Sequence, residues 1–381
     1  MSSGDRTFTT SGRHPAGLKA VAPKQQSSSS STVSGKVSSR CTRAIALRRK
    51  KIASHCARVG EDPYLAFEVR TIRMKSLFLS ASSSLDMPPL HSTTTHFFTV
   101  DVEEYFQVKA LESVVSPVEW LSRPSRVARS IDTLLDCLDR HGVRGTFFVL
   151  GWLAVHRPEV VRAIAGEGHE IASHGFRHER VTSLTPESFR EDLHSSKRAL
   201  EDLVGQAVLG YRAPSFSIVP GCEWAFDVLI EEEYRFDSSL FPIRRRGYGY
   251  PSAPRAPHII HRPCGVLAEF PLATTRLFNY PIPAAGGGYL RHFPFAVTRR
   301  AFREASERGE SATFYIHPWE IDSEQPRLDV SHLNRIRHYR GLRGTLERIE
   351  LLLQEFSFGS IASYLPRMEG QAAANPAKGA A

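Results

Sequence analysis

The chain has 381 residues, 41% of them hydrophobic, which is enough for one large domain or two smaller ones with a buried core. Its net charge of +9 comes from residues 1–86, which hold 15 of the 49 basic and 5 of the 40 acidic residues. The other 34 basic and 35 acidic residues nearly balance, so the body of the chain gives no electrostatic sign of nucleic-acid binding. No apolar run reaches about eighteen residues, so we expect no membrane insertion.

Residues 1–93 are predicted to be a disordered, basic and serine-rich extension. They contain the low-complexity stretch SSSSSTVSGKVSSR (Ser27–Arg40) and the basic run RRKK (Arg48–Lys51), which cannot bury enough apolar surface to fold. The apolar stretch after Met74 is too short for a secretory signal, and a transit peptide is the weaker alternative. We expect the native chain to start at Met87. The five widely spaced cysteines indicate reduced thiols in a cytoplasmic protein.

From His96 onward, strand and helix patterns alternate. Strands are predicted at 96–102, 146–151, 169–173, 208–212, 268–272 and 312–317. Helices are predicted at 125–141, 158–165, 186–203 and 331–356, with a long loop over 242–263. This alternation predicts a parallel sheet wound with helices, or a barrel. We assign 94–366 to one domain with a helical C-terminal extension, and 367–381 to a disordered tail.

Ionisable and polar side chains follow the ends of these strands, where parallel sheets and barrels carry their active sites. These residues are Asp101, Glu103, His174, His178, Arg212, Ser215 and His317. Because they would converge on one rim, together they are more informative than any single motif. His169, at the start of its strand, is expected to be structural.

The stretch SHGFRH (Ser173–His178) places two histidines four residues apart, and they can face one ion if the segment turns helically. Two imidazoles and one carboxylate form a metal site with an open position. Asp101 and Glu103 point to the same face of an extended strand, so either could be the ligand and the other a base. Arg212 would hold that base ionised through a bidentate contact.

His317 would lie opposite as a general acid for the leaving group. Each of these residues also has a plainer interpretation. The two histidines could be ordinary surface residues, Arg212 could form a surface ion pair, and His317 could pack on Trp319. The Arg244–Arg246 run is expected to be a solvated face, with contact to an acidic polymer or a lipid phosphate as the alternative.

Five motifs, TVDVEEYF, SHGFRH, YRAPSFS, YRFDSSLFP and FYIHPWE, occur in an order and spacing that resemble polysaccharide deacetylases of the NodB-homology type, carbohydrate esterase family four. The resemblance covers roughly His96–Leu365. Its last part, HPWEID followed by RIRHYRGLRGTLERIELLL, is similar to a subgroup found with exopolysaccharide and exosortase gene clusters in bacteria. It implies an α/β fold, a distorted (β/α) barrel, and a divalent metal, with zinc the expected ion.

The resemblance also implies residue roles by motif position. The implied metal ligands are Glu103, His174 and His178. The implied catalytic residues are Asp101 as base, Arg212 as its partner, His317 as acid and Asp237 as the group that tunes His317. A backbone N–H just after Pro214, that of Ser215, would help to hold the oxyanion.

Two departures from the family pattern concern the metal ligands. The family's first motif has two adjacent aspartates, whereas here the second acid is Glu103, one residue later and one carbon longer. Glu104 is the weaker candidate because it faces the other side of the strand. The hydroxyl residue usual after the first metal histidine is replaced by Gly175.

We therefore expect a metal-dependent N-deacetylase that acts on an N-acetylated saccharide in bacterial exopolysaccharide assembly. A lipid-linked sugar is one candidate substrate, which would place the protein at the inner face of the membrane. One alternative is a cyclic amide or ureide hydrolase on the same fold. Another is an inactive barrel that binds polysaccharide.

Overall fold

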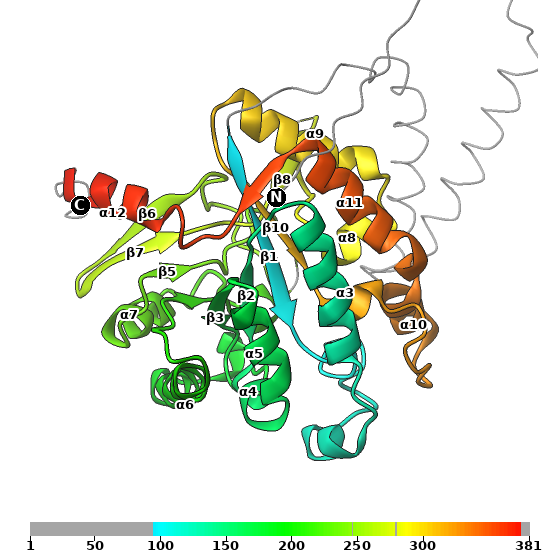
Figure 1. The fold of residues 1–381 in the computed structure, drawn as a ribbon. Helices are drawn as coiled ribbons and strands as arrows, with labels where there is room; N and C mark the ends of the chain where they lie inside the picture. The colour runs from blue at the N-terminus through cyan, green and yellow to red at the C-terminus, as the bar shows by residue number, and fades with distance from the viewer. Residues whose placement is uncertain (1–93, 246, 279, 375–381) are drawn as a thin grey trace, which may run out of the picture. The chain divides into compact units, whose positions relative to one another are not determined.

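The computed structural model describes residues 94–245, 247–278 and 280–374, so the predicted extension at 1–93 lies outside them. Within these residues, nine strands form one sheet in the order β10-β1-β2-β3-β4-β5-β7-β6, with β11 also paired to β1 (Figure 1). The strands are β1 (Thr95–Val102), β2 (Thr146–Val149), β3 (Glu170–Ser173), β4 (Gly210–Tyr211), β5 (Phe236–Asp237), β6 (His258–Arg262), β7 (Gly265–Glu269), β10 (Thr313–Ile316) and β11 (Ser357–Gly359). A separate hairpin joins β8 (Thr274–Leu277) to β9 (Tyr280–Pro283).

The sheet is parallel except for β6, which pairs antiparallel with β7. Just after β7, Leu272 pairs with Thr313 of β10 through a single parallel bridge. This bridge joins the two sides of the curled sheet, so the strands enclose an irregular barrel. The predicted α/β fold with a distorted (β/α) barrel is confirmed.

Helices cover the outside of the barrel (Figure 1). They are α3 (Val127–Arg140), α4 (Gly151–His156), α5 (Pro158–Gly166), α6 (Pro186–Val204), α7 (Trp224–Glu231), α8 (Gly287–His292), α9 (Phe295–Glu307), α10 (His332–Tyr339), α11 (Thr345–Glu355) and α12 (Leu365–Ala374). Helix α3 shows why the helices predicted in the first half of the domain lie close to the observed ones. Its buried residues recur at helical spacing and include Val127, Ile131, Leu134 and Leu138.

Three predictions in the C-terminal half are wrong. The expected loop over 242–263 contains β6, which adds an edge strand to β7. The expected helix over 331–356 is divided into α10 and α11, because Gly341 takes a left-handed backbone (φ 82°) where a Cβ would meet the Arg291 carbonyl oxygen. Residues 367–374 of the expected tail belong to α12, where Met368 is buried.

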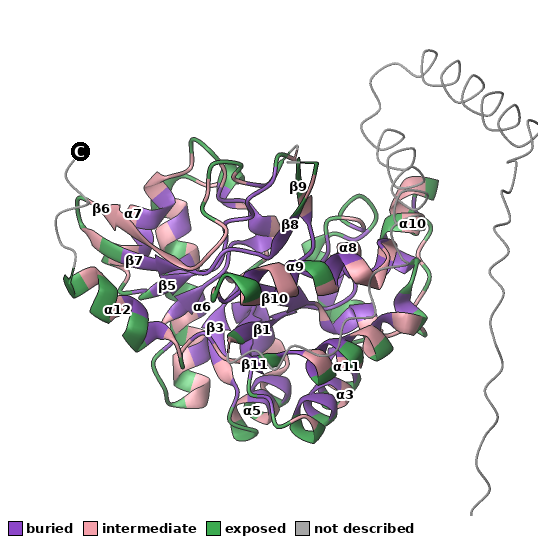
Figure 2. Ribbon diagram, turned by 90° about the horizontal axis from the view of Figure 1, so that it is seen from above, coloured by how far each residue is buried: buried purple, intermediate pink, exposed green. Residues whose placement is uncertain are grey.

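The two faces of the sheet bury different clusters of apolar side chains. Figure 2 shows that the central strands, such as β1, β3 and β10, are mostly buried. Alternation along β1 sends Phe98 and Val100 into the large cluster beneath the outer helices. Phe97 belongs to a separate cluster with Phe148, Ala172, Phe236, Ala268 and Phe270 from neighbouring strands and loops. Leu365 and Met368 of α12 complete this cluster, so the C-terminal helix closes the apolar end of the barrel interior. Along the described chain, no helix is long and apolar enough to cross a membrane.

Candidate active site

A carboxylate and two imidazoles converge at the carboxyl ends of β1 and β3. Glu103, His174 and His178 each offer one ligand atom, and these atoms all lie within 4.8 Å of one another. The His178 Nε2 lies 2.9 Å from Glu103 Oε2, yet this buried oxygen has no hydrogen bond among the described residues. A buried carboxylate oxygen without a hydrogen bond beside two imidazoles is a donor set that fits a divalent cation. The residues present therefore fit the implied metal.

The segment that carries both histidines is a tight loop and not a helical turn, yet the two rings still lie close together. Gly175 has φ 75° and His178 has φ 58°, so two left-handed residues turn the chain back on itself. Asp192 of α6 fixes the loop by accepting the Phe176 N–H at 3.1 Å. A Cβ on residue 175 would lie 2.7 Å from an Asp192 oxygen, which gives the local reason for glycine at this departure from the family pattern.

The first histidine of the loop is held in one tautomer. His174 Nδ1 lies 2.8 Å from the Arg212 carbonyl oxygen, which can only accept, so Nδ1 carries the proton. Burial lowers the pKa of His174 to about 4, which keeps the ring neutral. The Nε2 lone pair is then available to a cation.

Glu103 is ionised although it is almost fully buried. Burial alone would raise its pKa, but the nearby His178 and His317 lower the pKa of Glu103 to about 2. Glu104, the weaker candidate, turns away from this cluster and accepts the Arg126 N–H at 3.0 Å. The structure thus brings Glu103, not Glu104, to the two histidines.

Asp101 and Arg212 form a buried ion pair next to this cluster. Arg212 Nη1 donates to Asp101 Oδ1 at 2.6 Å, and the guanidinium also donates to Thr99 and to the Ser238 hydroxyl. Its Cζ lies 4.0 Å from the centre of the Phe148 ring. These contacts fix the guanidinium inside the barrel, and Asp101 Oδ2 remains directed toward His317 Nε2, 3.9 Å away.

His317 is oriented by Glu320, three residues further along the chain. His317 Nδ1 donates to Glu320 Oε2 at 2.8 Å, and Glu320 Oε1 accepts from Arg291 Nε at 2.6 Å. His317 Nε2 lies 3.2 Å from Glu103 Oε1. Burial alone would lower the pKa of His317, but the carboxylates of Glu103, Glu320 and Asp101 raise it to about 9.

Asp237 does not contact His317, so its expected tuning role is not supported by the geometry. It hydrogen-bonds to Glu269 on the neighbouring strand, and burial raises the pKa of both carboxyls. Two buried carboxyls in contact hold a proton between them. Asp237 Oδ1 also accepts from Ser239 Oγ at 2.6 Å, and Ser239 Oγ in turn accepts the Ala213 N–H at 2.8 Å. Asp237 therefore supports the turn that follows β4.

That turn places Pro214 and Ser215 beside the cluster. Ser215 has φ 57° and Phe216 has φ 52°, both in the left-handed region. With His178, they make three of the five non-glycine residues at positive φ in the described chain. Each such residue costs about 1 kcal/mol or more and persists where the surroundings impose it. The site therefore contains a concentration of backbone strain.

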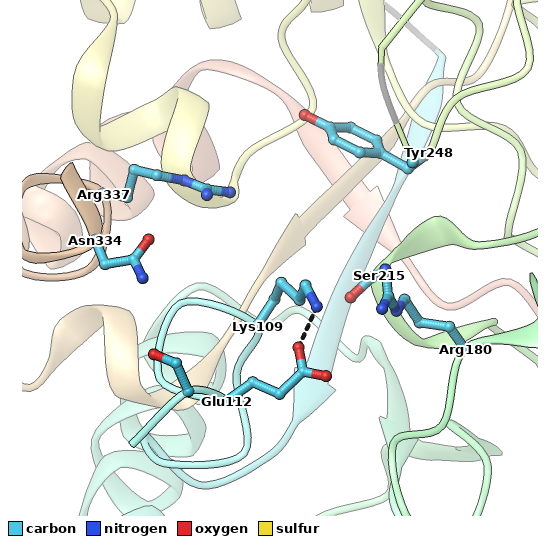
Figure 3. A pocket seen from close by; sticks show the side chains of 9 residues that line it. Lys109, Glu112, Arg180, Ser215, Tyr248, Asn334 and Arg337 are labelled. Carbon is cyan, nitrogen blue, oxygen red and sulfur yellow. Dashed lines mark hydrogen bonds and ion pairs between the residues drawn. The ribbon is translucent and has the colours of Figure 1, made fainter. Parts of the chain in front are cut away.

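Two cavities open beside these residues and have Lys109, Glu112, Arg180 and Ser215 in common. The smaller, about 240 Å³, is also lined by His178 and Trp120. The larger, about 590 Å³, extends to Asn334 and Arg337 of α10 and to Tyr248 (Figure 3). A ligand that reaches His178 thus has room to extend toward α10.

Sequence reasoning missed Glu320 and Arg291. The spacing HPWE carried a usable signal, because an acidic residue three positions after His317 can reach back to its backbone N–H, here at 3.2 Å. Arg291 had no such signal. It reaches Glu320 through the tertiary fold and also donates to the carbonyl oxygens of His338 and Arg340.

Two family models match two separate segments of the chain. Residues 125–219 match the family model described as Polysaccharide deacetylase, and this segment includes His174, His178 and Arg212. Residues 238–366 match a domain of unknown function, DUF3473, which includes His317 and Glu320. Asp101 and Glu103 precede both matches, so the site draws on three parts of the chain.

Relatives and solved structures agree with these matches. A chitooligosaccharide deacetylase of Bradyrhizobium sp. (strain ANU 289) is 31% identical over 96 residues, 25% of this chain and 42% of that protein. A peptidoglycan-N-acetylglucosamine deacetylase of Bacillus cereus is 33% identical over 93 residues, 24% of this chain and 34% of that protein. The chain thus spans less than half the length of either relative.

A crystal structure from Mycobacterium smegmatis, provisionally described as a polysaccharide deacetylase, shares the fold. Its TM-score is 0.50 at 20% identity, covering 75% of this chain and 94% of that one. The barrel with its histidine-carboxylate cluster, the family match and the relatives point to one class of protein. Residues 125–219 match the polysaccharide deacetylase family, the family that the motifs predicted, and the fold agrees with this match.

Proposed function

We propose that this protein is a metal-dependent N-deacetylase that hydrolyses the acetamido group of an N-acetylated saccharide. The observation that carries the proposal is the convergence of Glu103, His174 and His178 within 4.8 Å, with a buried Glu103 oxygen that makes no hydrogen bond among the described residues. The relatives are named for deacetylation of chitooligosaccharide and of peptidoglycan N-acetylglucosamine, which supports an acetylated amino sugar as substrate.

We assign Glu103, His174 and His178 as the metal ligands, with zinc the expected ion because two nitrogens and one oxygen suit it. When bound, the cation supplies Lewis acidity for the acetamide carbonyl. Asp101 takes the proton from the attacking water, because Arg212 occupies its Oδ1 and leaves Oδ2 facing the site. The backbone N–H of Ser215, after Pro214, stabilises the oxyanion.

His317 gives its Nε2 proton to the amine as the carbon–nitrogen bond breaks. Its Nδ1 is held by Glu320, so Nε2 is the nitrogen that faces Asp101 and Glu103. The products are acetate and a saccharide with one amino group. We further propose that this saccharide belongs to bacterial exopolysaccharide assembly, with a lipid-linked sugar as a candidate, and that the protein acts in the cytoplasm at the inner membrane face.

The test is acetate release from N-acetylglucosamine oligomers by the metal-stripped and the zinc-reloaded protein. Zinc-dependent acetate from the wild type is expected to disappear in His174→Ala. Ring opening of a cyclic amide without acetate would replace this proposal by a cyclic amide hydrolase. Saccharide binding with neither acetate nor bound zinc would indicate an inactive binding barrel.

A further inference from the structure

Basic side chains gather in the two cavities beside the candidate active site. The linings of both cavities together contain four basic residues, Lys109, Arg177, Arg180 and Arg337, and two acidic ones, Glu112 and Glu179. Residues 87–381 are nearly neutral, with 34 basic and 35 acidic side chains. The excess of positive charge in the cavities is therefore a local arrangement and not a consequence of composition.

The basic groups of the large cavity come from three separate parts of the chain. Lys109 follows β1, Arg180 follows β3, and Arg337 lies on α10. Figure 3 shows their side chains directed toward the same hollow, with Ser215 beside Arg180. Convergence from distant segments is the arrangement expected of a binding site, because basic residues on a solvated surface would not need to share one cavity.

Arg180 is the residue best placed to bind a ligand. It is half-buried, and in the described part of the chain it forms no ion pair, whereas Lys109 is already paired with Glu112. It lies two residues beyond His178 and lines both cavities. A guanidinium at this position offers two parallel N–H donors, which match the oxygens of a carboxylate or a phosphate.

Arg244 and Arg245, the described part of the Arg244–Arg246 run, lead to the large cavity. Gly247 and Tyr248 line the large cavity, Arg244 is exposed, and the backbone of Arg245 pairs with Tyr248. The sequence alone favoured a solvated face for this run. Its place next to the cavity lining favours the alternative, contact with an anionic ligand.

We propose that the substrate is an anionic saccharide, whose carboxylate or phosphate is bound by Arg180 in the cavity beside the acetylated sugar. Lys109 and Arg337 add to the positive field around it. This inference rests on the proposed deacetylase function and names its substrate class. A uronic acid in the sugar chain and a phosphate at its reducing end present the same chemistry to Arg180.

The experiment compares matched oligosaccharides on the zinc-loaded protein. The neutral probe is fully N-acetylated chitotetraose, the carboxylate probe is a tetrasaccharide of alternating N-acetylglucosamine and glucuronic acid, and the phosphate probe is di-N-acetylchitobiose 1-phosphate. One or both anionic probes should show the lower KM, and the preferred one identifies the source of the charge. Added salt should raise the KM of the anionic probes but not that of chitotetraose.

Arg180→Gln should raise the KM for the preferred anionic probe roughly tenfold and change it less than about twofold for chitotetraose. Arg180→Lys should give an intermediate value, because it keeps the charge but loses the bidentate contact. Arg162→Gln is the matched control, since it removes an exposed arginine of α5 that lies in neither cavity lining.

Equal KM values for neutral and anionic probes, with acetate released from both, would overturn this inference and leave the deacetylase function intact. If no probe releases acetate, the proposed function fails. Calorimetric titration of the anionic probes into wild type and Arg180→Gln then measures separately whether Arg180 contributes to binding of the anionic group. Equal affinities of the two proteins would overturn it.

Discussion

The two ends of β3 each carry a buried histidine, and the two histidines have different surroundings. His169, just before the strand, accepts the Gly145 N–H on Nδ1 at 3.0 Å and packs against Phe147. His174, just after the strand, donates its Nδ1 proton to the Arg212 carbonyl and lies in the cluster with Glu103 and His178. Burial lowers the pKa of both to about 4.

The difference between them lies in what the second nitrogen faces. At the carboxyl end of the strand, the loops turn back over the barrel and bring carboxylates to the histidines. At the amino end, His169 Nδ1 accepts a backbone N–H, and its Nε2 pairs with no carboxylate and has no hydrogen bond among the described residues. A neutral buried histidine is therefore not evidence of a site by itself, and the neighbouring carboxylates make the distinction.

The largest contrast is expected between His174→Ala and His169→Ala. The first should lose bound zinc and lower acetate release by at least about a thousandfold, since it removes a proposed metal ligand. The second should keep its zinc but lose roughly 2 kcal/mol of unfolding free energy, because a buried backbone N–H loses its acceptor. Metal analysis, the acetate assay and denaturant unfolding measure these effects. Equal loss of bound zinc from the two histidine variants would contradict this prediction.

Asp101→Asn should separate metal binding from catalysis at the carboxyl end. We expect acetate release to fall roughly a hundred- to thousandfold while zinc content is unchanged, because the proposed base is removed but the ligands remain. Stability should fall as well, since the buried Arg212 loses its counter-charge. A variant that releases acetate at the wild-type rate would refute the role of Asp101.

Glu320→Gln and Asp237→Asn test which acid supports His317. Glu320→Gln should lower kcat roughly 10- to 100-fold with little change in KM, because it weakens the contact that orients the ring. Asp237→Asn should lower kcat less than about threefold, since Asp237 contacts Glu269 and Ser239 instead. Equal losses of kcat in the two variants would restore the tuning role that the sequence motif implied for Asp237.

The smallest effect on acetate release is expected at the amino end of β3, from Glu170→Gln. Burial raises the pKa of Glu170 to about 7, and its carboxylate accepts from Thr146 Oγ and from the Ala362 N–H. A carboxyl with a raised folded-state pKa stabilises the fold at low pH and loses that contribution as the pH passes its folded pKa.

The unfolding free energy of the wild type should therefore fall by up to about 3 kcal/mol relative to that of Glu170→Gln as the pH rises from 5 to 8.5. Thermal or denaturant unfolding of both proteins across this range measures the difference. Acetate release at pH 7 should be nearly the same in the two proteins. Parallel stability curves would show that Glu170 titrates normally.

Much of the site was predictable, because parallel strands end on one rim. Asp101, Glu103, His174, Arg212 and His317 were each placed by the end of an expected strand, and the structure brings them together. The backbone path from His174 to His178 could not be predicted, because the left-handed turns at Gly175 and His178 depend on Asp192 of a later helix.

The C-terminal half was harder to predict, because its elements also depend on contacts between residues far apart in the sequence. Strand β6 exists through its pairing with β7, and the break at Gly341 depends on the close approach of Arg291. The last helix resembles a low-complexity tail in sequence, and burial of Met368 in the barrel makes it part of the fold. Local patterns do not contain these long-range contacts.

Helix α12 also bears on how the protein should be shortened for study. The DUF3473 match ends at residue 366, within a helix that continues to Ala374. A chain cut at that boundary would lack Met368, a buried member of the apolar cluster that contains Phe97 and Phe270. Such a fragment would keep every proposed catalytic residue and yet present a new apolar surface to solvent, so the sequence match is a poor guide to where the folded unit ends.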